Sequence, residues 1–125
     1  MSQSVLLIED ELDVREIVGH AIADAGYSAV GVGSGRTALE YLRSNPPPKL
    51  ILLDWHLPES SGADVMLEVV KSPAFDGVPV VLMTADARAA QESLQLGFAG
   101  YLHKPFTFDA LHAVLERFLP HATSG

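Results

Sequence analysis

The chain has no cysteine among its 125 residues. Disulfide bridges, zinc–thiolate centres and catalytic thiols are therefore excluded. Its uncharged apolar runs are also short, far below the roughly 20 residues that a membrane-spanning helix needs. The first residues, MSQSVLLIEDE, lack both the basic region and the long apolar region of a signal peptide. We therefore predict a cytoplasmic protein that does not insert into membranes.

Basic residues are scarce as well. Eight lysines and arginines stand against sixteen aspartates and glutamates, which gives a net charge of −8 at pH 7. A surface with this balance repels phosphate backbones and anionic lipids. We predict no direct binding to nucleic acid and none to a membrane surface.

The remaining composition is that of one globular domain. Hydrophobic residues make up 48% of the chain and charged residues 19%, a balance too apolar for a disordered protein. A chain of 125 residues buries about two-thirds of its unfolded surface and has the size of a single compact domain. We predict one domain over residues 1–125, with its core between about residues 5 and 119.

Short apolar segments alternate with segments of helical spacing. The apolar segments are nearly continuous, which is typical of strands buried on both faces: 5–9, 29–33, 50–54, 78–84 and 100–104. Helices are predicted over the stripe 14–25 and over 35–44, 63–71, 87–96 and 108–119. Ile17 is assigned to the inner stripe of the first helix and Phe108 to the buried face of the last. The strict alternation predicts a doubly wound α/β fold with a parallel sheet.

Polar residues stand where four of these strands end. The first strand ends in Glu9 and Asp10, the third in Asp54, the fourth in Thr84 and the fifth in Lys104. In open α/β sheets the ligand site lies outside the carboxyl ends of the strands, so these side chains are expected to converge. Each one alone has an ordinary explanation as a solvated carboxylate, a helix cap or a surface amine.

Taken together, the strand-end residues indicate a metal site beside an anion site. Three carboxylates on one sheet edge repel one another and favour a bound cation. With no histidine or cysteine at ligand spacing, an all-oxygen set suits a hard ion such as Mg²⁺, or Mn²⁺ in its place. Lys104 and Thr84 add a positive charge and a hydroxyl donor, which an anion held by that metal requires. The combination predicts phosphoryl chemistry.

Four segments carry a family resemblance: LLIEDE (6–11), LILLDWHLPESSG (50–62), VVLMTA (80–85) and GYLHKPF (100–106). In order and spacing they resemble the motifs of the receiver domain of two-component response regulators. The likeness extends over about residues 5–119. It implies the flavodoxin-like (βα)5 fold with strand order 2-1-3-4-5.

The resemblance implies a role for each polar strand end. Asp54 is implied as the phosphoacceptor, which forms an aspartyl phosphate from a phosphohistidine or a small acyl phosphate. Asp10 and Asp54 would bind Mg²⁺ directly and Glu9 through water. The main-chain carbonyl of His56 would complete the protein ligands, and Lys104 would pair with the phosphoryl oxygens.

Further positions follow from the same resemblance. Thr84 and Tyr101 match the family's switch residues, a hydroxyl that closes onto the phosphoryl group and an aromatic ring that turns inward after it. The peptide before Pro105 is implied to be cis. The turn after the acceptor is matched by Leu57, Pro58 and Gly62.

Two positions bear on the lifetime of the phosphorylated form. His56 lies two residues past Asp54 and Asp86 two residues past Thr84, where family members carry side chains that overlook the phosphoryl group. His56 fits equally well as an exposed loop histidine. The segment GFAG (97–100) lacks two acidic residues that the family often has before the switch aromatic, which alters the surface offered to partners.

We interpret the chain as a signalling switch rather than an enzyme. A sensor histidine kinase or a histidine phosphotransfer protein would phosphorylate Asp54 and change the surface formed by segments 87–96, 100–104 and 108–119. The protein would act as a monomer or as a phosphorylation-dependent dimer. The alternative within the same family is a passive phosphate-relay receiver excised from a hybrid histidine kinase.

Three other classes fit part of the pattern. Mg²⁺-dependent phosphatases of the haloacid dehalogenase type also form an aspartyl phosphate, but they usually carry a second aspartate where this chain has His56, and a cap domain. Flavodoxin-type cofactor binders need a Ser/Thr/Gly-rich loop after the first strand, where this chain has EDELD (9–13). A degenerate receiver that binds partners without phosphorylation would not need the intact set of Asp10, Asp54, Thr84 and Lys104.

Overall fold

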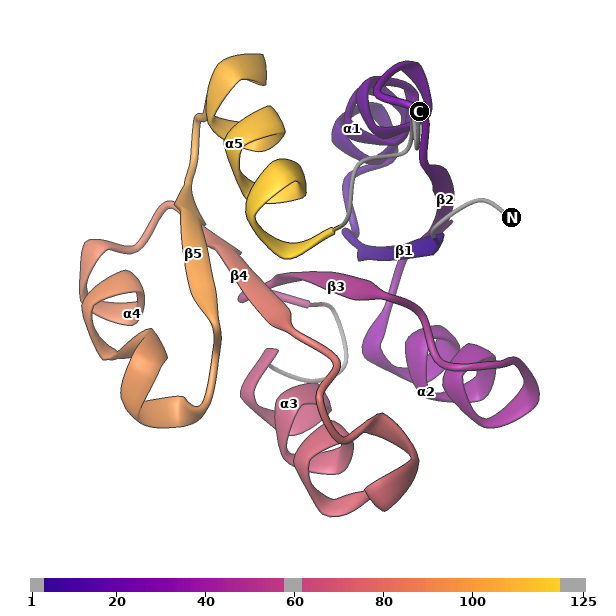
Figure 1. Ribbon diagram of the computed structural model, residues 1–125. Coiled ribbons are helices and arrows are strands. Elements are labelled where there is room, and N and C mark those ends of the chain that lie inside the picture. Colours follow the sequence, from indigo (N-terminus) through magenta and orange to yellow (C-terminus); the bar gives the residue numbers. More distant parts are fainter. Residues whose placement is uncertain (1–3, 58–61, 120–125) are drawn as a thin grey trace.

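A computed structural model describes residues 4–57 and 62–119 of the chain. Strands and helices alternate along these residues (Figure 1). They are β1 (Ser4–Ile8), α1 (Leu12–Asp24), β2 (Ser28–Val32), α2 (Gly35–Ser44), β3 (Leu50–Asp54), α3 (Gly62–Lys71), β4 (Val80–Thr84), α4 (Ala87–Glu92), β5 (Gly100–His103) and α5 (Phe108–Phe118), with 3₁₀ turns η1 (Pro73–Phe75) and η2 (Ser93–Leu96). All strand pairs are parallel, in the order β2-β1-β3-β4-β5, which confirms the predicted fold and strand order.

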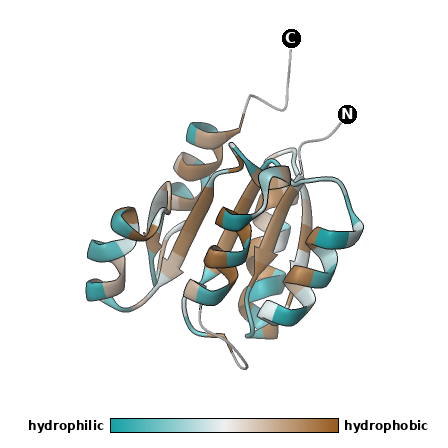
Figure 2. Cartoon of the chain, turned by 90° about the horizontal axis from the view of Figure 1, so that it is seen from below, coloured by the Kyte–Doolittle hydropathy of each residue, from teal (hydrophilic) through white to brown (hydrophobic). Residues whose placement is uncertain are grey.

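Helices cover both faces of the sheet. In Figure 1, α1 and α5 lie on one side of the strands and α2, α3 and α4 on the other. Two apolar cores match these layers: one joins Leu7 and Leu52 to α1 and α5, and the other joins Ile51 to helices of the opposite face. The strands are mainly hydrophobic, while the helices carry both hydrophilic and hydrophobic residues (Figure 2). Every residue of β3 and β4 is buried, as their continuous apolar sequence predicted.

The strand register brings the carboxyl ends to one edge. Ile8 pairs with Leu53, Asp54 with Met83, and Thr84 with His103. The residues after β1 and β5 therefore lie beside the last residues of β3 and β4. The backbone alone assembles the predicted site.

Two predicted burials are wrong. Ile17 is 56% exposed and Phe108 is 57% exposed. On α1 the core is filled by Val18, Ala21 and Ile22, so Ile17 lies at the margin of the apolar stripe. Phe108 is the first residue of α5, ahead of the turn in which Leu111 enters the core.

The helix predicted over 87–96 is shorter than expected. α4 ends at Glu92 and the chain continues as η2, which closes at Gly97 with φ 97°. The buried Ser93 hydroxyl donates to the carbonyl of Ala90 at 2.7 Å, a local bond that competes with regular helix geometry. None of the helices within 4–57 and 62–119 is long and apolar enough to cross a bilayer.

Candidate functional site

Glu9 is buried directly after β1. Its side chain has no exposed surface, and its Oε2 accepts a hydrogen bond from Lys104 Nζ at 2.8 Å. Its Oε1 accepts from the Glu11 N–H at 3.4 Å. Asp10, the next residue, is exposed. The acidic pair thus offers one carboxylate to the interior and one at the mouth of the site.

Asp54 ends β3 and is only 5% exposed. Its Oδ1 accepts from the His56 N–H at 3.3 Å, and its Oδ2 lies 3.5 Å from Lys104 Nζ. One carboxylate oxygen from each of Glu9, Asp10 and Asp54 falls within 4.8 Å of the others. The structure therefore brings together the three carboxylates that the sequence placed at strand ends.

This donor set fits a hard divalent cation. All three side chains offer oxygen, and together they could hold one ion with room for water ligands, which Mg²⁺ keeps when it binds proteins. Lys104 forms ion pairs with two of the three acids, Glu9 and Asp54. A metal would neutralise the remaining negative charge. The exposed Asp10 would let that metal reach solvent.

Burial and neighbouring charges in the site change the pKa of Asp54 most strongly. Burial, together with the negative charge of Glu9, raises the pKa of Asp54 to about 7. Lys104 and the His56 N–H oppose the shift. Burial alone would lower the pKa of Lys104, but its hydrogen bond to Glu9 and the charge of Asp54 outweigh burial, so the pKa is raised. Lys104 stays positive while Asp54 is poised between two protonation states.

Lys104 reaches the acids from the end of β5. Its N–H donates to the Thr84 carbonyl at 2.7 Å, which extends the pairing of β4 and β5 by one residue. The Lys104–Pro105 peptide is cis. The lysine side chain keeps 20% of its surface exposed.

Thr84 and Asp86 form a local hydrogen-bonded unit after β4. The Thr84 side chain is buried, and its Oγ1 accepts from the Asp86 N–H at 2.9 Å. The Asp86 carboxylate accepts from the N–H groups of Arg88 at 2.9 Å and Ala89 at 3.3 Å, and so caps α4. This helix cap was not predicted from the sequence. Tyr101, on β5, is 51% exposed.

Gly62, the first residue of α3, lies against the backbone that follows β3. Its N–H donates to the Trp55 carbonyl at 2.8 Å. A methyl group on Gly62 would lie 2.9 Å from the Asp54 carbonyl oxygen and 3.0 Å from Trp55 Cα, so only glycine fits this approach of two backbones. Leu57 packs against the core on the α2–α3 face, His56 is exposed, and Pro58 lies outside the described residues.

Arg15, which was not predicted as a site residue, also contacts the site. Arg15, on α1, donates from Nη1 to the main-chain carbonyl of Glu9 at 2.8 Å. Its stem lies over Gly31 and its guanidinium over Gly33. The only signal in the sequence was the pair of small residues in GVG (31–33), which is too common to single out an arginine.

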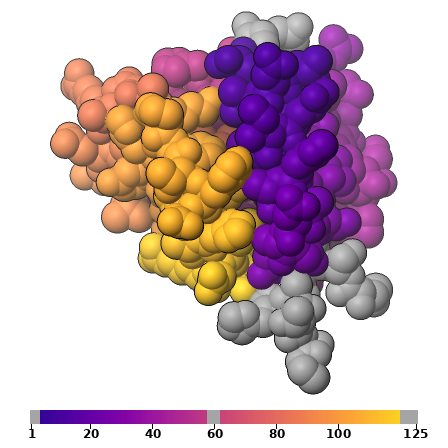
Figure 3. Space-filling view, turned by 90° about the horizontal axis from the view of Figure 1, so that it is seen from above, coloured from indigo at the N-terminus to yellow at the C-terminus, as the bar shows by residue number. Residues whose placement is uncertain are grey.

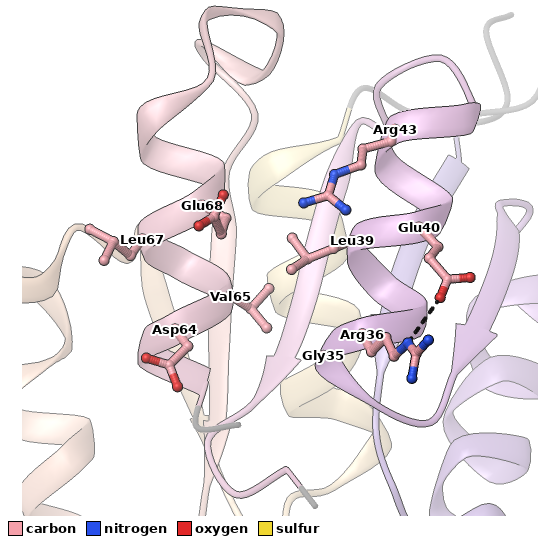
Figure 4. A pocket seen from close by; sticks show the side chains of 9 residues that line it. All are labelled: Gly35, Arg36, Leu39, Glu40, Arg43, Asp64, Val65, Leu67 and Glu68. Carbon is pink, nitrogen blue, oxygen red and sulfur yellow. Dashed lines mark ion pairs between the residues drawn. The ribbon is translucent and has the colours of Figure 1, made fainter. Parts of the chain in front are cut away.

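Two surface hollows differ in their relation to the site. An apolar groove runs from Lys104 and Phe108 to α1, where Ile17 lines it; Figure 3 shows α1 and α5 side by side on this face. A second hollow, between α2 and α3, is lined by both charged and apolar residues and includes the Arg36–Glu40 ion pair at 3.4 Å (Figure 4). None of its lining residues is a predicted site residue. The apolar groove is therefore the one continuous with the site.

Comparison with known proteins agrees with this geometry. The family described as the response regulator receiver domain matches residues 5–116. The chain is 30% identical over 115 residues to the chemotaxis protein CheY1 of Helicobacter pylori, covering 90% of this chain and 93% of CheY1. Two other curated relatives are longer proteins: this chain covers 25% of the regulatory protein AtoC and 56% of the phosphate regulon regulatory protein PhoB, both of Escherichia coli.

Two solved structures are similar over nearly the whole chain. The chemotaxis response regulator CheY4 of Vibrio cholerae superposes with a TM-score of 0.87 at 27% identity, covering 95% of this chain and all of that one. The receiver domain of the sensor histidine kinase PA1611 of Pseudomonas aeruginosa has a TM-score of 0.85 at 28% identity, covering 94% and 98%. That structure is described with a magnesium ion coordinated in its active-site cleft.

Proposed function

Because this chain belongs to the response regulator receiver domain family, we propose that it is switched by phosphorylation at Asp54 in a two-component signalling system. One observation carries the proposal. The Asp54 carboxylate is buried at the end of β3, 3.5 Å from Lys104 Nζ and within 4.8 Å of the oxygens of Glu9 and Asp10. A nucleophile, a cation for the transferred group and a set of metal ligands therefore share one site.

Asp54 would act as the nucleophile in its ionised form. One carboxylate oxygen attacks the phosphorus of a phosphohistidine or an acyl phosphate, an O–P bond forms, and the bond from phosphorus to the leaving group breaks. The departing imidazole or carboxylate keeps the bonding electrons and takes up any proton from solvent. Because the attacking oxygen carries no proton, the site needs no general base.

Lys104 would stabilise the transferred group. Its ammonium pairs with the Asp54 and Glu9 carboxylates before transfer, and it can turn to the phosphoryl oxygens once Asp54 is esterified. Glu9, Asp10 and Asp54 would hold Mg²⁺ or Mn²⁺, with the His56 carbonyl as a further ligand by family resemblance. The bound ion would supply positive charge for the equatorial phosphoryl oxygens. The magnesium described in the PA1611 receiver domain supports this assignment.

Thr84 would couple the new phosphoryl group to a structural change at the surface of the protein. Its Oγ1 accepts from the Asp86 N–H, which leaves the hydroxyl hydrogen available to a phosphoryl oxygen. Tyr101, half exposed on β5, would follow by turning inward. This is a switching role, and we propose that the chain acts as a phosphoacceptor that assists its own phosphorylation rather than as an enzyme for external substrates.

The donor would be a sensor histidine kinase or a histidine phosphotransfer protein. The apolar groove beside Lys104, with Ile17 and Phe108 on its walls, supports an approach of the donor from the α1–α5 side. The cytoplasmic location, the monomeric or phosphorylation-dependent dimeric state and the organisation as one domain stay predictions.

Phosphorylation can be tested by mass. Incubated with acetyl phosphate and Mg²⁺, the wild type should gain the mass of one phosphoryl group, and Asp54→Asn should gain none. Asp24→Asn, which changes the exposed last residue of α1, should label like the wild type. The adduct should be labile in base, as an acyl phosphate is. Equal labelling of the wild type and Asp54→Asn would overturn the proposal.

A further inference from the structure

Arg15 is a half-buried arginine of α1, and its guanidinium contacts the main chain at Glu9, directly after β1. It makes no ion pair with any carboxylate of residues 4–57 and 62–119. Its Nη1 instead donates to the carbonyl oxygen of Glu9 at 2.8 Å. Hydrogen bonds from charged donors are roughly twice as strong as neutral ones. The positively charged guanidinium of Arg15 therefore binds one peptide group, the Glu9 carbonyl.

The neighbouring chain segment leaves room for this arginine. Gly31 and Gly33 face α1, since Val30 and Val32 pack into the opposite core. A methyl group on Gly31 would lie 2.9 Å from Arg15 Cγ, and one on Gly33 would lie 2.8 Å from Arg15 Nη1. Neither glycine has a positive φ, so the backbone does not require glycine there. The two glycines serve as space for the arginine side chain.

The peptide that Arg15 holds is the one that joins Glu9 to Asp10. The Glu9 N–H donates to the Val32 carbonyl at 3.0 Å, so the backbone of Glu9 is fixed on both sides. Because the peptide is planar, fixing the Glu9 carbonyl also fixes the direction in which Asp10 begins. Glu9 then points inward to Lys104, and Asp10 is left at the mouth of the site.

We infer that Arg15 is a positioning residue for the metal site: by holding the Glu9 carbonyl, it orients the Glu9 and Asp10 carboxylates toward Asp54. This inference rests on the proposed function, because it assigns the support of the same acidic cluster. Groups that orient metal ligands typically change metal affinity by 10- to 100-fold when they are removed. Arg15 never touches the phosphoryl group in this scheme.

Mg²⁺ binding by the full chain, followed through the fluorescence of Trp55, tests the inference. Trp55 is the only tryptophan and is adjacent to Asp54. Arg15→Met keeps the unbranched stem and the helix propensity but removes the guanidinium, and it should weaken Mg²⁺ affinity about tenfold. Arg15→Lys keeps a donor and should recover part of the loss. Arg36→Met, on the exposed face of α2, should bind within twofold of the wild type.

Gly33→Ala gives an independent route to the same effect. Its methyl group would displace the far end of a flexible side chain, so the fold should tolerate it while the guanidinium leaves the Glu9 carbonyl. It should weaken Mg²⁺ affinity threefold or more on its own. In the Arg15→Met background it should add less than twofold, because the group that it displaces is already gone.

Metal-free protein supplies a second readout. Amide hydrogen exchange at Glu9, whose N–H is bonded to Val32, should become about tenfold faster in Arg15→Met and Gly33→Ala, while exchange at Leu7 inside β1 should not change. Equal acceleration at both amides would mean that Arg15 only stabilises the strand.

The outcomes separate the two claims. If the wild type binds Mg²⁺ and both Arg15→Met and Gly33→Ala bind it within twofold of the wild type, the inference is overturned and the proposed function stands. If the wild type shows no saturable response to Mg²⁺, the proposed function fails and the inference fails with it.

Discussion

Asp54 combines two demands that oppose each other. As a nucleophile it has to be ionised, yet it lies in a buried position beside another carboxylate, and its pKa is raised to about 7. A carboxyl whose pKa is higher in the folded than in the unfolded protein contributes stability only while it is protonated. Its contribution is complete below about pH 4 and is lost as the pH rises through about 7.

We therefore predict a pH-dependent gain from removing this charge. In EDTA, Asp54→Asn should be more stable than the wild type at pH 8 by about 1 to 3 kcal/mol, because the amide cannot ionise. The difference should shrink as the pH falls toward 4. Urea unfolding at pH 4, 6 and 8 measures it.

Addition of Mg²⁺ supplies the control for that experiment. The ion should stabilise the wild type at pH 8 and reduce the advantage of Asp54→Asn, since binding to the folded state alone raises its stability. A difference between the two proteins that is the same at every pH would contradict the assigned pKa and its cause.

His56 offers a residue-scale prediction about lifetime. Its side chain is exposed, whereas its N–H bonds to Asp54, so the side chain can be changed without disturbing the site backbone. His56→Asn should change the half-life of the phosphorylated form by more than about twofold and leave Mg²⁺ affinity within twofold. Loss of the label over time, followed by intact mass, measures the half-life. An unchanged half-life would make His56 an ordinary loop histidine.

For single residues, the sequence predicted those site residues whose position depends only on where the parallel strands end. Glu9, Asp54 and Lys104 converge because parallel strands end at one edge, a consequence of fold class. The Arg15 contact with the Glu9 carbonyl was not predictable, because it depends on a side-chain conformation across α1 and β2. The capping of α4 by Asp86 was not predicted, because the family resemblance implied a different role for that residue, in the lifetime of the phosphorylated form.

At the scale of elements, α1 and α5 leave apolar side chains uncovered next to the site. Ile17 and Phe108 are each more than half exposed and line the groove that reaches Lys104. Central apolar side chains of this kind often carry most of the affinity of a protein interface. We predict that the phosphohistidine donor protein buries both.

Substitution of Ile17 and Phe108 should slow phosphoryl transfer from protein donors but not from small-molecule donors. Phe108→Ser and Ile17→Ser should slow phosphoryl transfer from a phosphorylated sensor kinase about tenfold or more, while labelling by acetyl phosphate stays within twofold. Both side chains are exposed, so stability should change little. Leu67→Ser, at an equally exposed site on α3, is the matched control and should transfer like the wild type. Equal slowing with both donors would place the effect in the site itself.

The exposure of Ile17 and Phe108 also shows a limit of predicting burial from helical periodicity. Helical spacing identifies the direction of the apolar stripe, but not its width or how far the sheet extends under each end of the helix. Ile17 and Phe108 lie at those margins. The early end of α4 was equally hard to predict. The hydrogen bond from the Ser93 hydroxyl to the Ala90 carbonyl accompanies the change from α-helix to 3₁₀ turn, and helix propensity alone does not say where that change occurs.

At the scale of the molecule, the site and the α4–β5 region are joined by short hydrogen bonds. Thr84 links through its Oγ1 to Asp86, which caps α4, and through its carbonyl to the N–H of Lys104 after β5. A hydroxyl drawn toward a phosphoryl group would therefore disturb the start of α4 and the end of β5 together. α4 is a short helix with Ala89 and Ala90 as its buried anchors, so it has little packing to resist a shift.

The last prediction follows from this connection. A beryllofluoride adduct at Asp54 with Mg²⁺ should shift backbone NMR signals across residues 84–106, well beyond those that touch the site, because the adduct favours a second arrangement of α4 and β5. Thr84→Ala should reduce that spread while the signals of Asp10 and Asp54 still respond, since the hydroxyl connects the two regions. Wild-type shifts confined to the metal site would contradict a switch and leave a passive carrier of phosphate. Shifts that spread equally in Thr84→Ala would keep the switch but exclude Thr84 as its link.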